Sequence, residues 1–168
     1  GQLLALRPDL TIPIARLVST RMQEKTFPLK LFYQDNIFRT RESNSNKQVE
    51  EFQAGAEIFG DASTTADGEI ILQCIQAMQA LKIKNFCIEI GHYDFAPKND
   101  PEKTKALLEG DYVKLNGIPE RGKESIANTN TELKKLYQYL KDQQVDQFVS
   151  FNKGIIKDLH HYTGIIFE

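Results

Sequence analysis

Two strand-like segments joined by a polar loop constrain the fold of this chain more than any other feature. Residues 29–38 and 49–59 carry apolar side chains at alternating positions, and the eight residues 40–47 between them (TRESNSNK) are all polar. A period of two is typical of a strand whose two faces differ in exposure. The loop is longer than a tight turn requires, and such loops are either disordered or contact a ligand. The pattern predicts an antiparallel hairpin.

The second strand of this hairpin carries polar groups on one face. Side chains alternate along a strand, so Gln53, Gly55 and Glu57 point to the same side. An amide and a carboxylate then flank a residue with no side chain, which forms a shallow floor for a small molecule with an amino group. An ordinary strand with one solvated face is the alternative. The opposite face is apolar and small, suited to packing under a helix; it holds Ala54, Ala56 and Ile58.

Length and composition favour a soluble globular domain. The chain has 168 residues, of which 40% are apolar and 26% charged, enough for one core. Its formal net charge of −2 provides no broad basic field for nucleic acid, and no apolar run approaches the roughly 20 residues of a membrane span. Cys74 and Cys87 match no zinc-binding spacing. We expect two buried, unreactive thiols in a cytoplasmic protein.

Apolar spacing outside the hairpin predicts further helices and strands. A helix is expected at 11–24, with Thr11 as its N-cap, and a second helix begins after Ser63. Short strands are expected at 3–6, where the residues are apolar, and at 86–90.

The segment 96–147 is richer in Lys, Glu and Asn, and its apolar residues are sparser. We interpret it as a small helical insertion that packs weakly on a core formed by 1–95 and 148–168. Its short helices are expected at 101–109, 111–116 and 131–142, and core strands at 146–151 and 164–168.

Hairpins and short links, without regular strand–helix alternation, favour class α+β: an antiparallel or mixed sheet flanked by helices. The chain begins with Gly1 and ends on a strand-like segment. We therefore expect sequence to be missing at both ends.

Four short motifs, in this order, resemble the catalytic core of class II aminoacyl-tRNA synthetases of the histidyl type. Residues 6–11 (LRPDLT) are similar to the family's LRPEGT element, and Phe38-Arg39 before a polar loop is similar to motif 2. Residues 53–57 (QAGAE) resemble the QxGxE strand, and 162–168 (YTGIIFE) resemble YTGxxFE. Each motif is weak alone, but four in register are specific and span nearly the whole chain outside the insertion.

The resemblance implies a histidine pocket. In this family the pocket is formed by the positions that match Asp9, Thr11, Gln53, Glu57 and Tyr162. The arginine that matches Arg39 contacts the carboxylate–phosphate end of the ligand. The chemistry agrees, because an ammonium group needs carboxylate and amide acceptors and an imidazole needs a carboxylate or phenol partner.

The chain departs from the synthetase pattern where ATP would bind. Arg41 replaces the glutamate that holds adenine, and 46–49 (NKQV) replace an arginine-rich GRYR stretch. Lys157 replaces the arginine of the RGLDYYTG loop and lacks its planar, two-pronged donors. The amino-acid positions are kept while the ATP positions are lost, which is what a histidine sensor requires.

This combination resembles the regulatory subunits of ATP phosphoribosyltransferase, a synthetase-like family. The resemblance implies a non-catalytic protein without catalytic residues, metal or cofactor, required for the first step of histidine biosynthesis. It implies the short-form catalytic subunit as partner, L-histidine as feedback effector and a self-dimer, with no membrane or nucleic acid. A fragment of an active histidyl-tRNA synthetase is the alternative.

Several of these residues also have simpler interpretations. Asp9 caps the helix that follows it as readily as it binds a ligand. Glu57 is alternatively a solvated strand carboxylate, and Tyr162 a packed core residue with a satisfied hydroxyl. His92 is expected in a turn rather than at a metal. The adjacent histidines 160–161 face opposite ways in an extended chain, so no metal is assigned.

Overall fold

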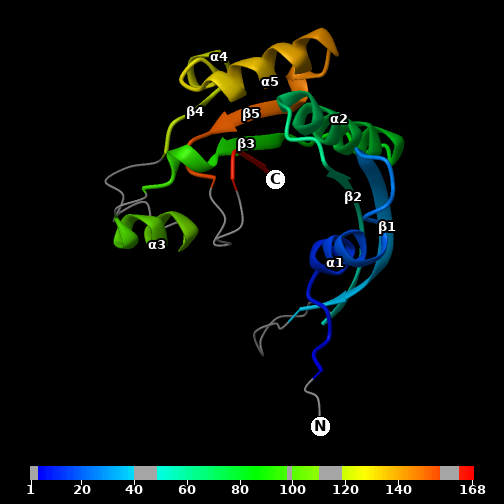
Figure 1. The fold of residues 1–168 in the computed structure, drawn as a ribbon. Coiled ribbons are helices and arrows are strands. Elements are labelled where there is room, and N and C mark those ends of the chain that lie inside the picture. The colour runs from blue at the N-terminus through cyan, green and yellow to red at the C-terminus, as the bar shows by residue number, and fades with distance from the viewer. Residues whose placement is uncertain (1–3, 40–48, 98–99, 110–118, 156–162) are drawn as a thin grey trace. The chain divides into compact units, whose positions relative to one another are not determined.

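The computed structural model describes residues 4–39, 49–97, 100–109, 119–155 and 163–168 (Figure 1). The chain divides into two compact units, Gly1–Asp61 and Ala62–Glu168. Several sequence predictions lie outside the described residues: the loop 40–47, the helix 111–116, and Arg41, Lys157, His160, His161 and Tyr162.

The first unit is a helix and a long hairpin. Its elements are α1 (Thr11–Arg21), β1 (Leu29–Phe38) and β2 (Glu50–Phe59). The strands are antiparallel in unbroken register from Leu29↔Phe59 to Phe38↔Glu50, which confirms the predicted hairpin. Antiparallel partners share a face, so Gln53 and Glu57 lie on the same side as Asp35 and Leu31.

The helix α1 is attached to the polar face of the hairpin. Thr11 at its start is hydrogen-bonded to Glu57. On the opposite face Phe32 and Phe52 are 84% and 67% exposed, and Ala54 is exposed as well. The predicted packing of the apolar face under a helix is therefore wrong at Ala54.

The start of the chain is also less regular than predicted. Residues 4–7 form no strand, and Leu4 and Leu6 are 82% and 69% exposed, so the strand expected at 3–6 is wrong over its described part. Leu10 occupies the N-cap position of α1 without a capping side chain, so Thr11 is not the cap.

The second unit contains a mixed sheet with the strand order β4–β5–β3–β6. The strands are β3 (Ile88–His92), β4 (Arg121–Gly122), β5 (Val149–Asn152) and β6 (Ile165–Phe167). The pair β3–β5 is parallel, and the other two pairs are antiparallel. The helices are α2 (Thr64–Ala80), α3 (Pro101–Glu109), α4 (Glu124–Ala127) and α5 (Thr131–Asp142), with 3₁₀ turns η1 (Tyr93–Phe95) and η2 (Asp146–Phe148). These sheets and helices confirm class α+β.

Helices α2 and α5 start at side-chain caps and pack closely together. Ser63 Oγ accepts from the Ala66 amide at 3.2 Å, and Asn130 Oδ1 accepts from the Glu132 amide at 2.8 Å. Gly68 on α2 permits the approach, because a Cβ there would lie 2.5 Å from the Tyr139 ring on α5.

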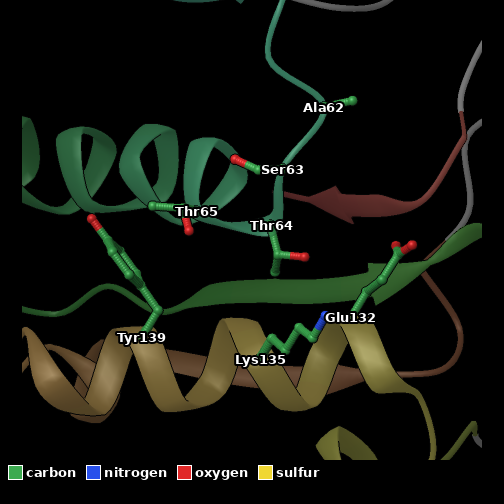
Figure 2. A pocket seen from close by; sticks show the side chains of 7 residues that line it. All are labelled: Ala62, Ser63, Thr64, Thr65, Glu132, Lys135 and Tyr139. Carbon is green, nitrogen blue, oxygen red and sulfur yellow. The ribbon is translucent and has the colours of Figure 1, made fainter.

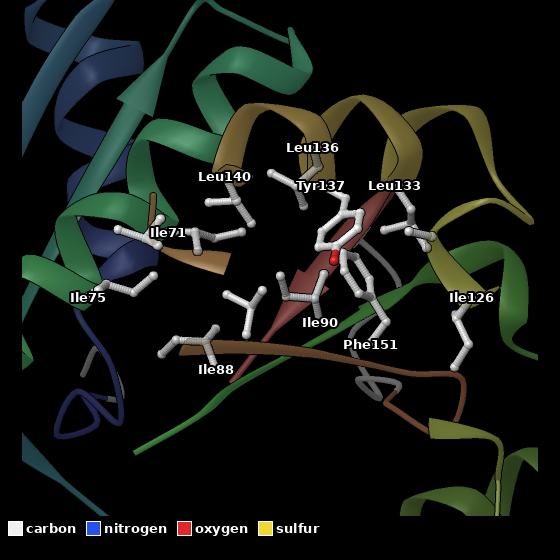
Figure 3. Close-up of a cluster of buried hydrophobic side chains, with 13 residues drawn as sticks. Ile71, Ile75, Ile88, Ile90, Ile126, Leu133, Leu136, Tyr137, Leu140 and Phe151 are labelled. Carbon is white, nitrogen blue, oxygen red and sulfur yellow. The ribbon is translucent and has the colours of Figure 1, made fainter. Parts of the chain in front are cut away.

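One apolar core joins these helices to the sheet (Figure 3). Its members include Ile71, Ile75, Ile88, Ile90, Ile126, Leu133, Leu136, Leu140 and Phe151. The helices α4 and α5 thus share their core with α2, β3 and β5. The expectation that 96–147 packs weakly is wrong for these two helices, whereas the proposed domain boundaries at 95 and 148 stay a prediction.

The cysteines differ from each other in exposure. Cys74 is half-buried on α2, and burial raises the pKa of its thiol. Cys87 is exposed, so the expectation of a buried thiol is wrong there. Both are free thiols. Within the described ranges, no helix is both long and apolar enough to cross a membrane.

Leu136→Ala tests whether α5 belongs to the core of the second unit. Leu136 is fully buried, and we expect its truncation to lower the free energy of unfolding by about 2–5 kcal/mol. Lys134→Ala, at an exposed site on the same helix, should change it by no more than about 0.5 kcal/mol. Urea unfolding followed by circular dichroism measures both, and equal effects would contradict the shared core.

Candidate functional site

The segment 8–11 contacts side chains from both ends of the hairpin. Thr11 Oγ1 donates to Glu57 Oε1 at 2.8 Å, and Arg39 Nε donates to the Pro8 carbonyl at 3.4 Å. Asp9 Oδ1 accepts from the Ile12 amide at 3.3 Å, so Asp9 does contact the first turn of α1 as a cap would. Asp9, Thr11, Arg39 and Glu57 are therefore gathered along one short segment.

Arg7 holds this segment against β1. Its Nη2 lies 2.6 Å from Asp35 Oδ2, and its Nε donates to the Asn36 carbonyl at 2.8 Å. Its own carbonyl accepts from the Phe38 amide at 2.9 Å. The Asn36 amide, and then the Arg7 guanidinium, hold the pKa of Asp35 below its usual value. This role of Arg7 was not predicted, because the sequence signals it only by an arginine in the LRPDLT segment.

Gln53 and Glu57 lie on the face of β2 that α1 contacts. Four residues along a strand place them about 13 Å apart. Gln53 Oε1 is buried, and no group in the described part of the chain donates a hydrogen bond to it. A buried acceptor without a donor is costly, so this oxygen is suited to a donor brought by a ligand.

Tyr33 covers the glycine between them. It pairs with Gly55 across the hairpin, and a Cβ on Gly55 would overlap the Cζ and Oη atoms of the ring. The expectation that a ligand lies directly against the Gly55 backbone is therefore wrong for this structure. Tyr33 forms the middle of the floor, which the sequence analysis missed because the contact depends on the register.

The charges on this side of the hairpin favour a cationic group. Among the described residues, this face and the segment 8–11 carry the carboxylates of Asp9, Asp35, Glu51 and Glu57, against the guanidinium groups of Arg7 and Arg39. Within the described residues the contacts of Arg39 are long, 4.0 Å to Glu51 Oε2 and 3.4 Å to the Pro8 carbonyl. Its guanidinium therefore remains suited to an anionic group such as a carboxylate.

A separate cavity of about 490 Å³ lies between α2 and α5 in the second unit (Figure 2). It is lined by Ala62, Ser63, Thr64, Thr65, Glu132, Lys135 and Tyr139. It contains no residue that the sequence analysis assigned to a site. Across the described residues no group of three or more His, Cys, Asp or Glu side chains could hold a metal ion.

Comparison with known proteins places this chain in a family. Residues 1–99 match the family model described as Histidyl-tRNA synthetase. The ATP phosphoribosyltransferase regulatory subunit of Clostridium novyi (strain NT) is 32% identical over all of this chain and 50% of its own length. The same-named protein of Alkaliphilus metalliredigens (strain QYMF) is 34% identical, over 100% of this chain and 53% of its own. The chain thus spans about half the length of these curated relatives.

Solved structures share the fold. An ATP phosphoribosyltransferase regulatory subunit/histidyl-tRNA synthetase from Bacillus halodurans C has a TM-score of 0.83 and 27% identity, over 96% of this chain and 53% of its own. The ATP phosphoribosyl transferase (HisG:HisZ) complex from Thermotoga maritima gives 0.68 at 19% identity, over 99% and 71%. Apo histidyl-tRNA synthetase of S. aureus gives 0.63 at 18%, over 96% and 36%. These matches confirm the synthetase-like fold that the four motifs predicted.

Gly55→Ala tests the Tyr33 floor through the sign of its effect. Alone, the added methyl group should displace the Tyr33 ring and lower the free energy of unfolding by about 1–3 kcal/mol. In a Tyr33→Ala background the same substitution should stabilise by about 0.5–1 kcal/mol, because glycine is unfavourable within a strand. Denaturant unfolding of the wild type, the two single variants and the double variant measures both effects. If Gly55→Ala destabilises the protein in both backgrounds, the contact between Tyr33 and Gly55 is contradicted.

Proposed function

The chain belongs to the histidyl-tRNA synthetase family, and on that premise we propose that it is the synthetase-like core of a regulatory subunit of ATP phosphoribosyltransferase. Curated relatives near 30% identity over the full chain carry this name, which supports a non-catalytic role. The substitutions at Arg41 and Lys157 support it as well, because both remove groups that a synthetase uses on ATP.

The proposed partner is the short-form catalytic subunit, which condenses ATP with phosphoribosyl pyrophosphate in the first step of histidine biosynthesis. A structural neighbour described as a HisG:HisZ complex supports an assembly of this kind. We also propose that the protein forms a self-dimer and lies in the cytoplasm.

We further propose that the hairpin face binds L-histidine as a feedback effector. The observation that carries this step is the buried Gln53 Oε1, an acceptor for which the described residues supply no donor. The α-ammonium group would donate to it or to the Glu57 carboxylate, which already holds the Thr11 hydroxyl. The Tyr33 ring lies between these two acceptors, and its π face would attract the cationic ammonium group.

The other end of the amino acid would meet Arg39. Its weakly paired guanidinium would take the ligand carboxylate. Tyr162, outside the described residues, would contact the imidazole, as the family resemblance implies. Histidine would then favour one arrangement of the complex with the catalytic subunit, by a coupling free energy of about 1–3 kcal/mol.

Glu57→Ala tests the effector site. Losing a charge-assisted hydrogen bond of about 1.5–3 kcal/mol should weaken histidine binding by roughly ten- to 150-fold. Calorimetric titration of the purified protein with L-histidine measures this. Glu50→Gln is the matched control: it lies on the opposite face of the same strand and keeps an acceptor for Asn36, so its affinity should not change. Equal binding by Glu57→Ala and wild type would refute the contact with Glu57, and a wild-type protein that binds no histidine would refute the site.

Reconstitution with the short-form catalytic subunit tests the partner. We expect the mixture to form phosphoribosyl-ATP faster than the catalytic subunit alone and to be inhibited by histidine. A complex with Glu57→Ala should assemble and keep its activity but lose the inhibition, because only the effector contact is removed.

An active histidyl-tRNA synthetase is the second candidate function, because the matching family model carries that description. Histidine-dependent exchange of pyrophosphate into ATP distinguishes the two functions. We expect none, and measurable exchange would overturn the regulatory assignment.

A further inference from the structure

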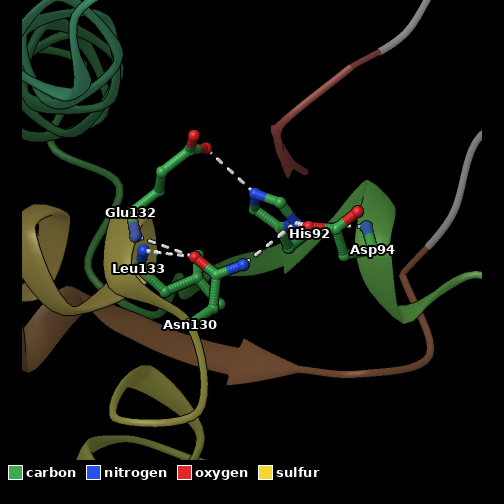
Figure 4. A network of polar contacts seen from close by, with 5 residues as sticks. All are labelled: His92, Asp94, Asn130, Glu132 and Leu133. Carbon is green, nitrogen blue, oxygen red and sulfur yellow. Dashed lines mark hydrogen bonds and ion pairs between the residues drawn. The ribbon is translucent and has the colours of Figure 1, made fainter.

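The buried polar network around His92 in the second unit is satisfied by the chain itself (Figure 4). His92 is 4% exposed and ends β3, so the expectation that it lies in a turn is wrong. The Asp94 amide donates to its Nδ1 at 3.1 Å, and Glu132 Oε2 lies 3.0 Å from its Nε2. Asn130 Nδ2 lies 3.4 Å from Nδ1, while Asn130 Oδ1 accepts from the Glu132 amide at the start of α5. Both ring nitrogens have partners within the chain, so the network does not require a ligand.

A second polar network, in the first unit, is centred on Arg7. Its Nη2 lies 2.6 Å from Asp35 Oδ2, and its Nε donates to the Asn36 carbonyl at 2.8 Å. The planar guanidinium holds these two donors in fixed directions. The backbone carbonyl of Arg7 accepts from the Phe38 amide at 2.9 Å. Side chain and backbone together attach Arg7 to positions 35–38 of β1.

These contacts fix a position more than they stabilise the fold. The side chains of Arg7 and Asp35 are 39% and 53% exposed, and an ion pair at such exposure contributes little to the free energy of unfolding. The contacts do determine where the segment 8–11 begins. That segment ends at Thr11, whose Oγ1 donates to Glu57 Oε1 at 2.8 Å. One carboxylate oxygen of Glu57 is thereby held, which orients the other oxygen for a ligand.

Arg7 also neutralises a carboxylate close to the buried amide oxygen. Asp35 pairs with Gln53 across the hairpin, so the two side chains lie on the same face. A carboxylate without a cation at this place would compete with Gln53 Oε1 for an ammonium group. The Arg7 guanidinium, 2.6 Å from Asp35 Oδ2, removes that competition.

We propose that Arg7 is a positioning residue for the proposed histidine site. It acts through Thr11 on the Glu57 carboxylate and does not itself touch the ligand. This inference rests on the proposed function, since it assigns Arg7 to the acceptors of the α-ammonium group. All the residues on which it depends belong to the first unit.

Three variants test the role by calorimetric titration with L-histidine. Arg7→Ala should weaken binding by about tenfold, the lower end of what one charge-assisted hydrogen bond contributes. Asp35→Asn keeps an acceptor oxygen for Arg7 and should bind within about twofold of wild type. Arg16→Ala, the matched control, removes an exposed guanidinium from α1 and should bind as wild type does.

A double-mutant cycle distinguishes positioning from a general loss of structure. Thr11→Val removes the hydroxyl that donates to Glu57 and keeps a side chain of similar shape. If Arg7 acts through this hydrogen bond, Arg7→Ala should weaken binding by less than about twofold in the Thr11→Val background. The same loss in both backgrounds would overturn the action through Thr11.

L-Histidinol, in which a hydroxymethyl group replaces the carboxylate, distinguishes positioning from direct contact. Both ligands carry the ammonium group, so Arg7→Ala should weaken the binding of histidine and of histidinol by the same factor. A loss confined to histidine would overturn the positioning role in favour of a contact between Arg7 and the ligand carboxylate.

Hydrogen exchange at the Phe38 amide tests the attachment of Arg7 without any ligand. This amide donates to the Arg7 carbonyl, so its exchange should quicken in Arg7→Ala and not in Arg16→Ala. Unchanged exchange in Arg7→Ala would overturn the proposal even if binding fell. Unchanged histidine affinity in Arg7→Ala would overturn the positioning role alone, whereas a wild-type protein that binds no histidine would refute the proposed function and the positioning role with it.

Discussion

The register between β1 and β2 decides what the candidate site contains. Ten paired positions place Gln53 and Glu57 on the face that carries Asp35 and Tyr33. A slip of one residue would turn all of them to the other side. Arg7 adds a second constraint, because it ties the segment before α1 to Asp35 and to the backbone of β1. The register and the contacts of Arg7 together bring Thr11 within hydrogen-bond distance of Glu57.

Much of the fold could be predicted from local patterns. The hairpin and the helices α2, α3 and α5 follow from the sequence pattern, and the start of α2 also follows from Ser63. The strand expected at 3–6 is wrong because apolar residues alone do not provide a partner strand: Leu4 and Leu6 are exposed. The four-residue helix α4 and two-residue strand β4 are too short to leave a period.

The candidate site was predictable in part. Side-chain alternation correctly placed Gln53 and Glu57 together, and the motif resemblance added Asp9, Thr11 and Arg39. Tyr33 was missed because its contact with Gly55 depends on pairing 22 positions apart in sequence. His92 was expected in a turn but ends strand β3, and its contact with Glu132 joins residues 40 positions apart. Interactions between distant segments leave no mark in a local pattern.

The face of the hairpin opposite α1 exposes two large apolar side chains. Phe32 and Phe52 stand out from a two-stranded ribbon, 84% and 67% exposed. An exposed apolar face on a two-stranded sheet favours association with other molecules. We therefore expect this chain to aggregate in concentrated solution, and lysine at these two positions to reduce that aggregation.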